Sequence, residues 1–414
     1  MKKYILYLLL IGNCILSSCR KDIAIDSAFA PEINLHLKYK MFGDTSPFSN
    51  PLSMTLTNTT EQITYQFKSD LWGKFTLVQL LPGEYTISVT GTLTAAEVTQ
   101  VTGKNAVDGS NLIGFKSSVN FKQGETPLLS DIDLILPTQS SLIFKELYYC
   151  GSRTPSNGSY RNDNFYTIYN NSDNPVLLNN VYIANTENYG GIGVTGPLWP
   201  GETQGEYKHV YLQAIWKIVA GENPVYIQPG QSVTIATMAA PHNQDSQYNL
   251  SSPVNLIDAD YEAYSSDPSN KYTDFPAVNM SRAFWPDYGD LWRISVLGQG
   301  MVLIQATKEE FSGFGTVTLP EAFQDPFENE EYWLCKKVPV KFIIDAVDLI
   351  QNKTVTNTKR FPPMLDSGFA TVAGTYTGSS VIRKIIGNKN GRLIYQDSNN
   401  STEDFEVSPK AIFK

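Results

Sequence analysis

Alternating carboxylates are the best candidate for metal chemistry in this sequence. Asp258, Asp260 and Glu262 occupy every second position at the start of the segment DADYEAYSSDPS. Calcium prefers oxygen ligands, and calcium-binding loops supply them from alternate positions. An EF-hand loop also needs glycine at its sixth position and glutamate at its twelfth, where this segment has Ala263 and Ser269. The sequence therefore leaves open an irregular calcium site and, as the alternative, a solvated acidic loop.

Histidine ligands and catalytic motifs are scarce. The three histidines, His36, His209 and His242, lie far apart, and none occurs in an H-E-x-x-H pattern. A zinc site draws on several histidine or cysteine ligands. The sequence contains no G-x-S-x-G, Walker or G-x-G-x-x-G pattern. We therefore predict no catalytic residues, no cofactor apart from the calcium alternative, and a non-enzymatic protein.

Large aromatic residues are concentrated in one stretch of the chain. Five of the six tryptophans lie between residues 199 and 333. Within it, Pro286 and Gly289 interrupt the segment SRAFWPDYGDLWR (281–293), which predicts a loop. An exposed rigid ring offers a large contact area at low entropic cost. The candidate ligand-binding rings of this loop are Phe284, Trp285, Tyr288 and Trp292. The alternative is that the rings form the core of long insertions.

The first residues indicate export and a lipid anchor. Lys2 and Lys3 precede an apolar run of roughly a dozen residues, which suits a secretory signal and is shorter than the about 20 residues of a membrane span. The run ends in Leu16-Ser17-Ser18-Cys19, which resembles the bacterial lipobox. The resemblance implies a signal peptide at 1–18 and acylation of Cys19, for example with palmitate. The alternative is a plain exported protein.

Residues 19–30 are expected to form a tether. Its early charges, Lys21 and Asp22, resemble the surface-export tags of Bacteroidetes lipoproteins, and Asp26-Ser27-Ala28 resembles an O-glycosylation motif of that phylum at Ser27. These resemblances imply a lipid-anchored protein of the outer membrane that faces the cell surface.

Two cysteines remain after the signal and the anchor. Cys150 and Cys335 are an even pair in an oxidising compartment, so the sequence permits either a disulfide or two buried, inert thiols. The formal net charge is −9. Because nucleic-acid binding depends on clustered Lys and Arg, an acidic chain predicts no nucleic-acid partner.

Short β-branched and aromatic runs between Gly, Pro, Asn and Asp clusters predict a mainly β protein of two sandwich domains. In residues 31–137, Tyr85, Ile87 and Val89 alternate after the turn residues LPGE. The strand–LPGEYTISV–strand pattern resembles the prealbumin-like modules of surface lipoproteins. We expect residues 31–137 to form this first sandwich.

Residues 138–414 are expected to form the second domain. The segments TIYNNSDNPVLLNNVYI and VYIQPGQSVTIATM resemble parts of the lamin-tail domain, an immunoglobulin-like sandwich. FIIDAVDLI and the end of the chain resemble the last strands of that domain. Insertions are expected at about 186–224 and 239–335. A short helix is predicted over 209–221, because Leu212, Ile215, Trp216 and Val219 follow helical spacing.

As a whole, the chain resembles an uncharacterised family of Bacteroidetes outer-membrane lipoproteins with a domain of unknown function. The resemblance implies a fold and a location but no reaction, since one sandwich fold carries many functions. The expected role is non-enzymatic binding of a glycan, peptide or haem nutrient beside a TonB-dependent transporter. The alternatives are a hydrolase of glycans or peptides and a structural or adhesion scaffold.

Overall fold

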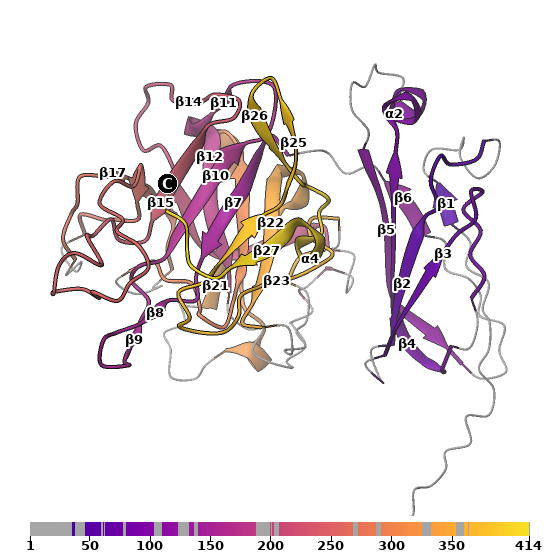
Figure 1. Cartoon of the computed structure of the whole chain (residues 1–414), viewed down its shortest axis with the longest axis horizontal. Coiled ribbons are helices and arrows are strands. Elements are labelled where there is room, and N and C mark those ends of the chain that lie inside the picture. The colour runs from indigo at the N-terminus through magenta and orange to yellow at the C-terminus, as the bar shows by residue number, and fades with distance from the viewer. Residues whose placement is uncertain are drawn as a thin grey trace, which may run out of the picture.

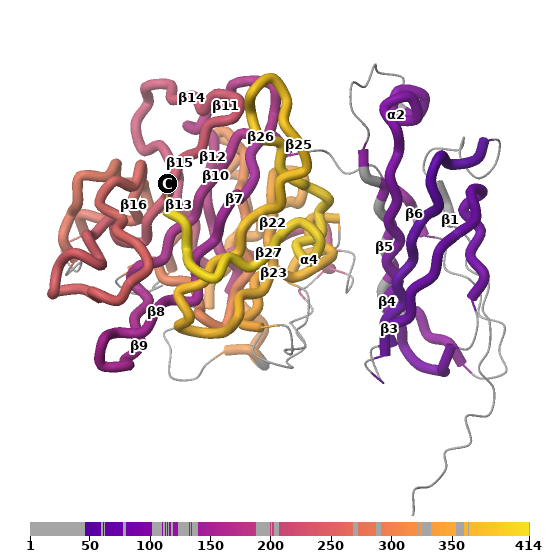
Figure 2. Tube along the Cα trace, viewed as in Figure 1, coloured from indigo at the N-terminus to yellow at the C-terminus, as the bar shows by residue number. Residues whose placement is uncertain are grey.

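The chain folds into β-sheets with few helices (Figures 1 and 2). This computed structural model describes residues 35–37, 46–58, 61, 63–77, 80–102, 110–122, 132–135, 140–187, 199, 201–202, 207–267, 272–286, 291–324, 333–352, 360–362 and 364–413. Cys19, Ser27 and Tyr288 lie outside the described residues. The prediction of a mainly β protein is confirmed. None of the described helices is both long and apolar enough to span a bilayer.

The described residues of the N-terminal domain form a six-stranded sheet and a helix, α2 (Ala95–Thr102). Its strand order is β1-β6-β5-β4-β2-β3, antiparallel except for the parallel pair β1–β6. The strands are β1 (Leu35–Leu37), β2 (Ser53–Asn58), β3 (Ile63–Lys68), β4 (Gly83–Leu93), β5 (Ser110–Phe121) and β6 (Ile132–Ile135). A prealbumin-like sandwich has two sheets, whereas the described residues of this domain form a single sheet.

Alternating side chains build the N-terminal core. Tyr85, Ile87 and Val89 of β4 are buried, as the sequence pattern predicted, beside Met54 and Leu56 of β2. Segments outside the strands also contribute buried residues to this core: Phe48, Leu52, Leu77 and Leu80. One face of the sheet is therefore covered by chain that joins its strands.

The C-terminal domain is a sandwich of two larger sheets. The first has the order β17-β16-β15-β10-β7-β24-β27. Its strands are β7 (Leu142–Tyr148), β10 (Phe165–Asn170), β15 (Ser232–Ala236), β16 (Tyr261–Glu262), β17 (Val278–Asn279), β24 (Ser380–Arg383) and β27 (Phe405–Ser408). A short helix, α4 (Ser401–Asp404), precedes β27.

The second sheet has the order β20-β21-β13-β12-β19-β22-β23, and β18 also pairs with β13. Its strands are β12 (Val181–Thr186), β13 (His209–Lys217), β18 (Ser281–Phe284), β19 (Gly300–Gln305), β20 (Gly315–Thr318), β21 (Leu334–Pro339), β22 (Ile343–Ile350) and β23 (Ala370–Thr371). Three two-stranded pairs complete the described strands: β8 (Ser152–Arg153) with β9 (Ser159–Tyr160), β11 (Val176–Leu177) with β14 (Tyr226–Ile227), and β25 (Ile385–Lys389) with β26 (Arg392–Tyr395).

The second sheet is buried on both of its faces. Ile183 and Trp216 point into the main core between the two sheets, which also holds Tyr166 of the first sheet. On the opposite face, Tyr182 stacks on Phe311 of helix α3 (Lys308–Ser312), with ring centroids 4.4 Å apart. Both sides of the sheet are therefore apolar environments.

This double burial explains why the predicted helix over 209–221 is wrong. Residues 209–217 form the inner strand β13, and residues 210–216 are all buried. A strand buried on both faces is apolar at nearly every position, so periodicity alone does not separate it from a buried helix. The two expected insertion ranges contribute β13, β18, β19 and β20 to the second sheet, and β16 and β17 to the first.

Candidate ligand-binding groove

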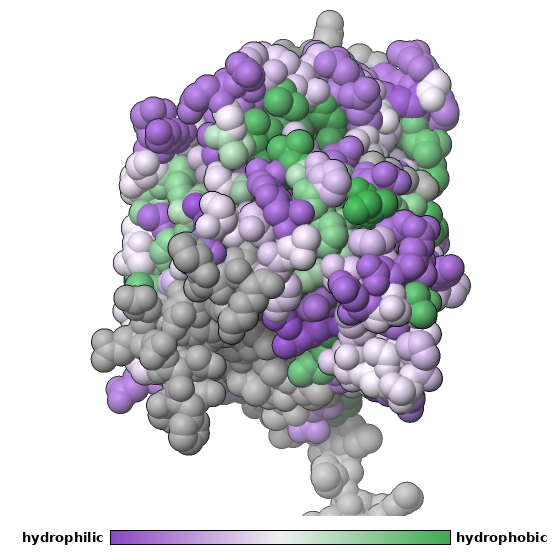
Figure 3. Space-filling model, turned by 90° about the vertical axis from the view of Figure 1, so that its left-hand side faces the viewer, coloured by the Kyte–Doolittle hydropathy of each residue, from purple (hydrophilic) through white to green (hydrophobic). Residues whose placement is uncertain are grey.

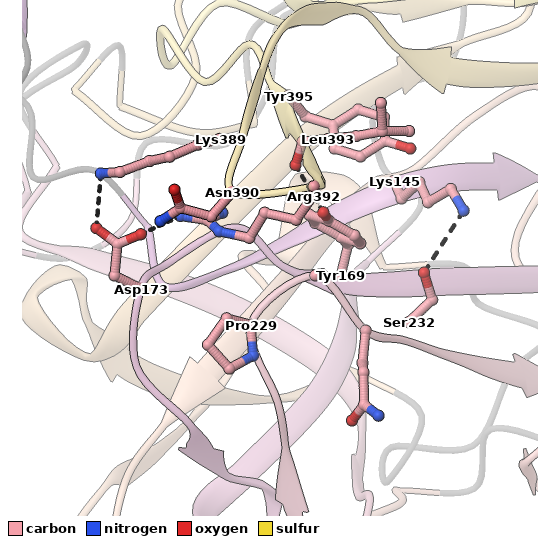
Figure 4. A pocket seen from close by; sticks show the side chains of 13 residues that line it. Lys145, Tyr169, Asp173, Pro229, Ser232, Lys389, Asn390, Arg392, Leu393 and Tyr395 are labelled. Carbon is pink, nitrogen blue, oxygen red and sulfur yellow. Dashed lines mark hydrogen bonds and ion pairs between the residues drawn. The ribbon is translucent and has the colours of Figure 1, made fainter.

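Two adjoining cavities form a groove on the first sheet of the C-terminal domain. Their volumes are about 730 Å³ and 540 Å³, and they share Lys145, Ser232 and Tyr395. We call their union the hairpin groove, because the hairpin β25–β26 lines both cavities. The remaining lining residues are Glu146, Thr167, Tyr169, Asp173, Pro229, Gly230, Gln231, Thr234, Ile382, Arg383, Lys384, Ile385, Lys389, Asn390, Gly391, Arg392, Leu393, Glu406 and Ile412. Figure 4 shows the larger cavity from close by.

A row of side chains across five strands forms the floor of the smaller cavity. Thr234 pairs with Thr167, Thr167 with Glu146, Glu146 with Ile382, and Ile382 with Glu406. Paired residues of neighbouring strands face the same side of a sheet. The register of β15, β10, β7, β24 and β27 therefore places these five side chains on one face.

The hairpin β25–β26 forms a wall that is fixed to the sheet. Its two-residue turn, Asn390-Gly391, has positive φ at both residues (52° and 84°), as a type I′ turn requires. The Tyr169 hydroxyl donates to Leu393 O at 2.6 Å. Asn171 and Tyr395 exchange two hydrogen bonds of 3.0 Å. The wall is therefore preorganised.

The Pro229-Gly230 turn forms a second rim of the larger cavity. Gly230 has φ +81°, and a Cβ there would lie 2.8 Å from the Arg392 Cβ. Only glycine combines this conformation with so close an approach. Gly230 thus lets the rim approach the hairpin next to its turn, at Arg392.

Three cations and one carboxylate surround the larger cavity (Figure 4). Asp173 accepts from Lys389 Nζ at 2.9 Å and also from Arg392 Nη2. Hydrogen bonds from Lys389 and Arg392 hold the pKa of Asp173 below its usual value. Lys145 Nζ lies 3.5 Å from Ser232 Oγ. The cavity therefore carries a local excess of positive charge.

Glu146 is a buried carboxyl in the smaller cavity. Its side chain accepts from Ser380 Oγ at 2.6 Å and from the Ile412 amide at 2.7 Å. Burial nevertheless raises the pKa of Glu146 to about 7, because the charged form loses its hydration. The carboxyl therefore exchanges its proton near neutral pH.

The predicted aromatic platform is largely packed into the protein. Trp292 is fully buried, and its Nε1 donates to Asn185 Oδ1 at 2.7 Å. Trp285 is half-buried and packs edge-on against Trp216, with centroids 5.2 Å apart. Phe284 belongs to strand β18 instead of a loop, and it packs against the apolar cluster that contains Tyr182 and Phe311. Figure 3 shows the end of the domain around β17, where apolar residues are interspersed with polar ones.

The alternating carboxylates are divided between the surface and the interior. Asp258 is exposed, whereas Asp260 accepts from the Thr234 amide at 2.7 Å. Glu262 is buried and accepts two other backbone amides, from Ala239 and Phe275. Among the described residues there is no group of three or more His, Cys, Asp or Glu that could hold a metal ion. The carboxylates of Asp260 and Glu262 thus serve as hydrogen-bond acceptors for backbone amides of neighbouring segments.

The candidate disulfide between Cys150 and Cys335 is not formed. Both are free, buried thiols. Cys150 Sγ lies 3.1 Å from Ser379 O beside the main core, whereas Cys335 belongs to a separate cluster with Trp199. The alternative of two buried thiols therefore holds, because the fold places the two cysteines in different cores.

Sequence reasoning missed the residues of the hairpin groove. Asn390-Gly391 between apolar runs is a strong local hairpin signal and could have located the wall. Nothing near Lys145 or Asp173 in the sequence indicates that they meet Arg392, more than 200 positions later.

A model of a known protein family matches a segment that contains part of the groove. Residues 228–411 match the family model described as a protein of unknown function (DUF4876). The chain is similar to DUF4876 proteins. A crystal structure of a DUF4876 family protein from Bacteroides thetaiotaomicron VPI-5482 has a TM-score of 0.56 and 26% identity, over 91% of this chain and 94% of that one. The match supports the resemblance to an uncharacterised family, and the DUF4876 segment contains both the Pro229-Gly230 rim and the hairpin.

A second solved structure is more distant. It is a "putative adhesin" from Bacteroides ovatus ATCC 8483, with 8% identity and a TM-score of 0.20, over 72% of this chain and 85% of that one. Among curated proteins, none matches this chain.

Proposed function

We propose that this protein is a non-enzymatic outer-membrane lipoprotein that binds a ligand in the hairpin groove. The observation that carries the proposal is the groove itself. Ligand pockets are typically about 300–1,000 Å³, and the larger cavity of about 730 Å³ falls in this range. Its walls belong to a sheet and an anchored hairpin, so a ligand would meet a site that is already formed.

In this proposal, Cys19 carries the lipid that holds the protein in the outer membrane, and the folded domains face the cell surface. The ligand is a nutrient, for which glycan, peptide and haem are the classes to test. A TonB-dependent transporter is the proposed partner that receives the ligand. The lipobox-like segment that ends in Cys19 supports this location.

A variant that fills the groove tests the binding site. Ser232 is exposed where the two cavities meet, so Ser232→Trp places a large ring in both. Ser156→Trp adds the same ring at an exposed position outside the groove. We expect titration calorimetry with glycan, peptide and haem panels to detect binding to the wild type and Ser156→Trp, and loss of it in Ser232→Trp. Binding that survives in Ser232→Trp would place the site elsewhere, and no binding by the wild type would remove the proposal.

The anchor and the partner are tested in cells. Mass spectrometry of the purified protein should find an acylated Cys19, and Cys19→Ala should shift the protein out of the membrane fraction. Co-purification from solubilised membranes should recover a transporter barrel with the wild type. An unmodified N-terminus would contradict the proposed location.

A hydrolase of glycans is a second candidate, favoured by one observation. Glu146, whose pKa is raised to about 7, lines the same cavity as the exposed Glu406. A carboxyl that is protonated near neutral pH suits a general acid, and a second carboxylate suits a base. Glycan turnover that disappears in both Glu146→Gln and Glu406→Gln would establish this candidate over simple binding. A structural or adhesion scaffold would show neither ligand binding nor turnover.

A further inference from the structure

The larger cavity is positively charged although the protein is acidic. The chain has a formal net charge of −9. Around this cavity, however, Lys145, Lys389 and Arg392 outnumber the single carboxylate of Asp173. Opposite charge steers and holds a ligand most effectively inside a concave site. The cavity therefore favours an anionic ligand over a cationic one.

Asp173 shows which anionic group the cations accept. Its carboxylate lies between Lys389 Nζ and Arg392 Nη2 and contacts both. The Asp173 side chain is 56% exposed, whereas that of Arg392 is 13% exposed. The cations thus belong to the wall of the cavity, and the carboxylate reaches them from the solvent side. One carboxylate oxygen contacts the lysine and the other contacts the arginine, and such charge-assisted hydrogen bonds are stronger than neutral ones.

The hairpin does not depend on Asp173 for its position. Arg392 Nη1 also donates to Asn171 O at 2.9 Å, and the Tyr169 hydroxyl holds Leu393. Asn171 and Tyr395 add a reciprocal pair of hydrogen bonds. Asp173 can therefore leave Lys389 and Arg392 while the wall stays in place.

The lining and the topology favour a saccharide over a peptide. Exposed Gln231, Ser232 and Asn390 offer amide and hydroxyl groups that suit sugar hydroxyls. Extended peptides commonly bind by adding a strand to a free sheet edge. Of the five floor strands, β15, β10, β7 and β24 are paired on both sides and β27 is at the edge, so most of the groove lies over a face of the sheet.

We propose that the hairpin groove binds an acidic oligosaccharide whose carboxylate displaces Asp173 from Lys389 and Arg392. Asp173 then acts as a built-in competitor that occupies the carboxylate position until the ligand arrives. Exposed ion pairs contribute little to stability, so the displacement lowers ligand affinity by about fivefold at most. This inference rests on the proposed binding function of the groove.

The test compares acidic and neutral saccharides on the full-length protein in detergent. The probes are trigalacturonate, its neutral methyl ester and trigalactose, measured by titration calorimetry. Asp173→Asn removes the competitor, and Lys389→Gln removes one of the cations while Arg392 still anchors the hairpin. Asp258→Asn makes the same charge change at an exposed site outside the groove. Thermal melts confirm that each variant is folded.

We expect Asp173→Asn to bind trigalacturonate more tightly than the wild type, by up to about fivefold. Lys389→Gln should bind it at least tenfold more weakly than Asp173→Asn. Asp258→Asn should match the wild type, and the two neutral probes should bind all variants alike. Equal affinity in Asp173→Asn and the wild type would overturn the competitor role. Failure of both to bind trigalacturonate, or equal binding of triglutamate, would overturn the ligand class. Neutral ligands that bind the wild type and are lost only in Ser232→Trp would refute this inference and leave the proposed function standing.

Discussion

Arg383 of β24 and Asp345 of β22 join the two sheets of the C-terminal sandwich. Arg383 Nη2 lies 2.8 Å from Asp345 Oδ2, and both side chains are almost fully buried. The Nη1 of the same guanidinium contacts Asp397 at 3.2 Å and Asp404 at 3.4 Å. Burial raises the pKa of Asp345 against the opposing effect of the Arg383 charge. One cation therefore balances several buried carboxyls beside the groove.

Loss of that cation should destabilise the domain strongly. Arg383→Met leaves three buried carboxyls without their counter-charge, and breaking a buried pair costs about 3–5 kcal/mol. We expect the free energy of unfolding in urea to fall by that amount at pH 7. Arg153→Met, at an exposed arginine, should change it by less than about 0.5 kcal/mol. Similar effects of both substitutions would show that the network contributes little.

Glu146 should make stability depend on pH near neutrality. Its folded pKa of about 7 lies above its ordinary 4.5, so between these values the folded state holds a proton that the unfolded state releases. Stability therefore falls as pH rises through this window. Relative to the wild type, Glu146→Gln should gain up to about 3 kcal/mol between pH 5 and pH 8. Urea titrations across this range measure the difference, and a constant difference would contradict the assigned protonation.

His242 should have the opposite pH dependence. Burial lowers its pKa to about 4, while its ring nitrogens contact the Tyr160 hydroxyl at 2.7 Å and Met238 O at 3.0 Å. The unfolded histidine binds a proton below pH 6.5, so stability is lost as pH falls from 6.5 towards 4. Between pH 7 and pH 4.5, the wild type should lose about 2 kcal/mol relative to His242→Gln. Proton NMR of the ring would contradict this if it titrated near 6.5 in the folded protein.

Thiol chemistry checks the two buried cysteines. In a chain that begins after Cys19, Cys150 and Cys335 should both be unreactive towards a thiol reagent in the folded state, because both are fully buried. Denaturation without reductant should release two reactive thiols per chain. If denaturant released none, the pair would be oxidised in solution.

The aromatic residues separate by burial into two classes of substitution. Trp292→Ala removes a fully buried ring and should cost about 3–5 kcal/mol of C-terminal domain stability. Tyr226→Ala, in the same domain, removes a side chain that is 53% exposed and should cost less than about 0.5 kcal/mol. Calorimetric unfolding measures both. An equally small loss of stability in both variants would indicate that Trp292 is exposed, as the sequence suggested.

Local patterns predicted the parts of the fold that one buried face determines. Tyr85, Ile87 and Val89 alternate because one side of β4 is covered by the core of its domain. β13 was mistaken for a helix because both of its sides are covered. The period of its apolar residues then carries no information about which structure contains them.

The candidate site was hidden from the sequence for a different reason. Lys145, Asp173 and Arg392 meet through the pairing of strands that are distant in the chain, and each is an ordinary surface residue type. Phe284 and Trp292 attracted attention through size, yet large rings are used mostly to fill cores. The concentration of aromatic residues therefore indicated where the core lies, but it did not indicate where the groove lies.

The double burial of the second sheet removes the usual penalty against strand slippage. A strand with one solvent-exposed face cannot shift by one residue without exposing its apolar side chains to water. In β12, β13 and β19, the same shift would move each side chain from one apolar core to the other. Irregular steps interrupt their ladders at Asn185/Thr186, Ile215/Trp216 and Leu303/Ile304. We therefore expect that removing one of these irregular steps would yield compact molecules with a mixture of strand registers.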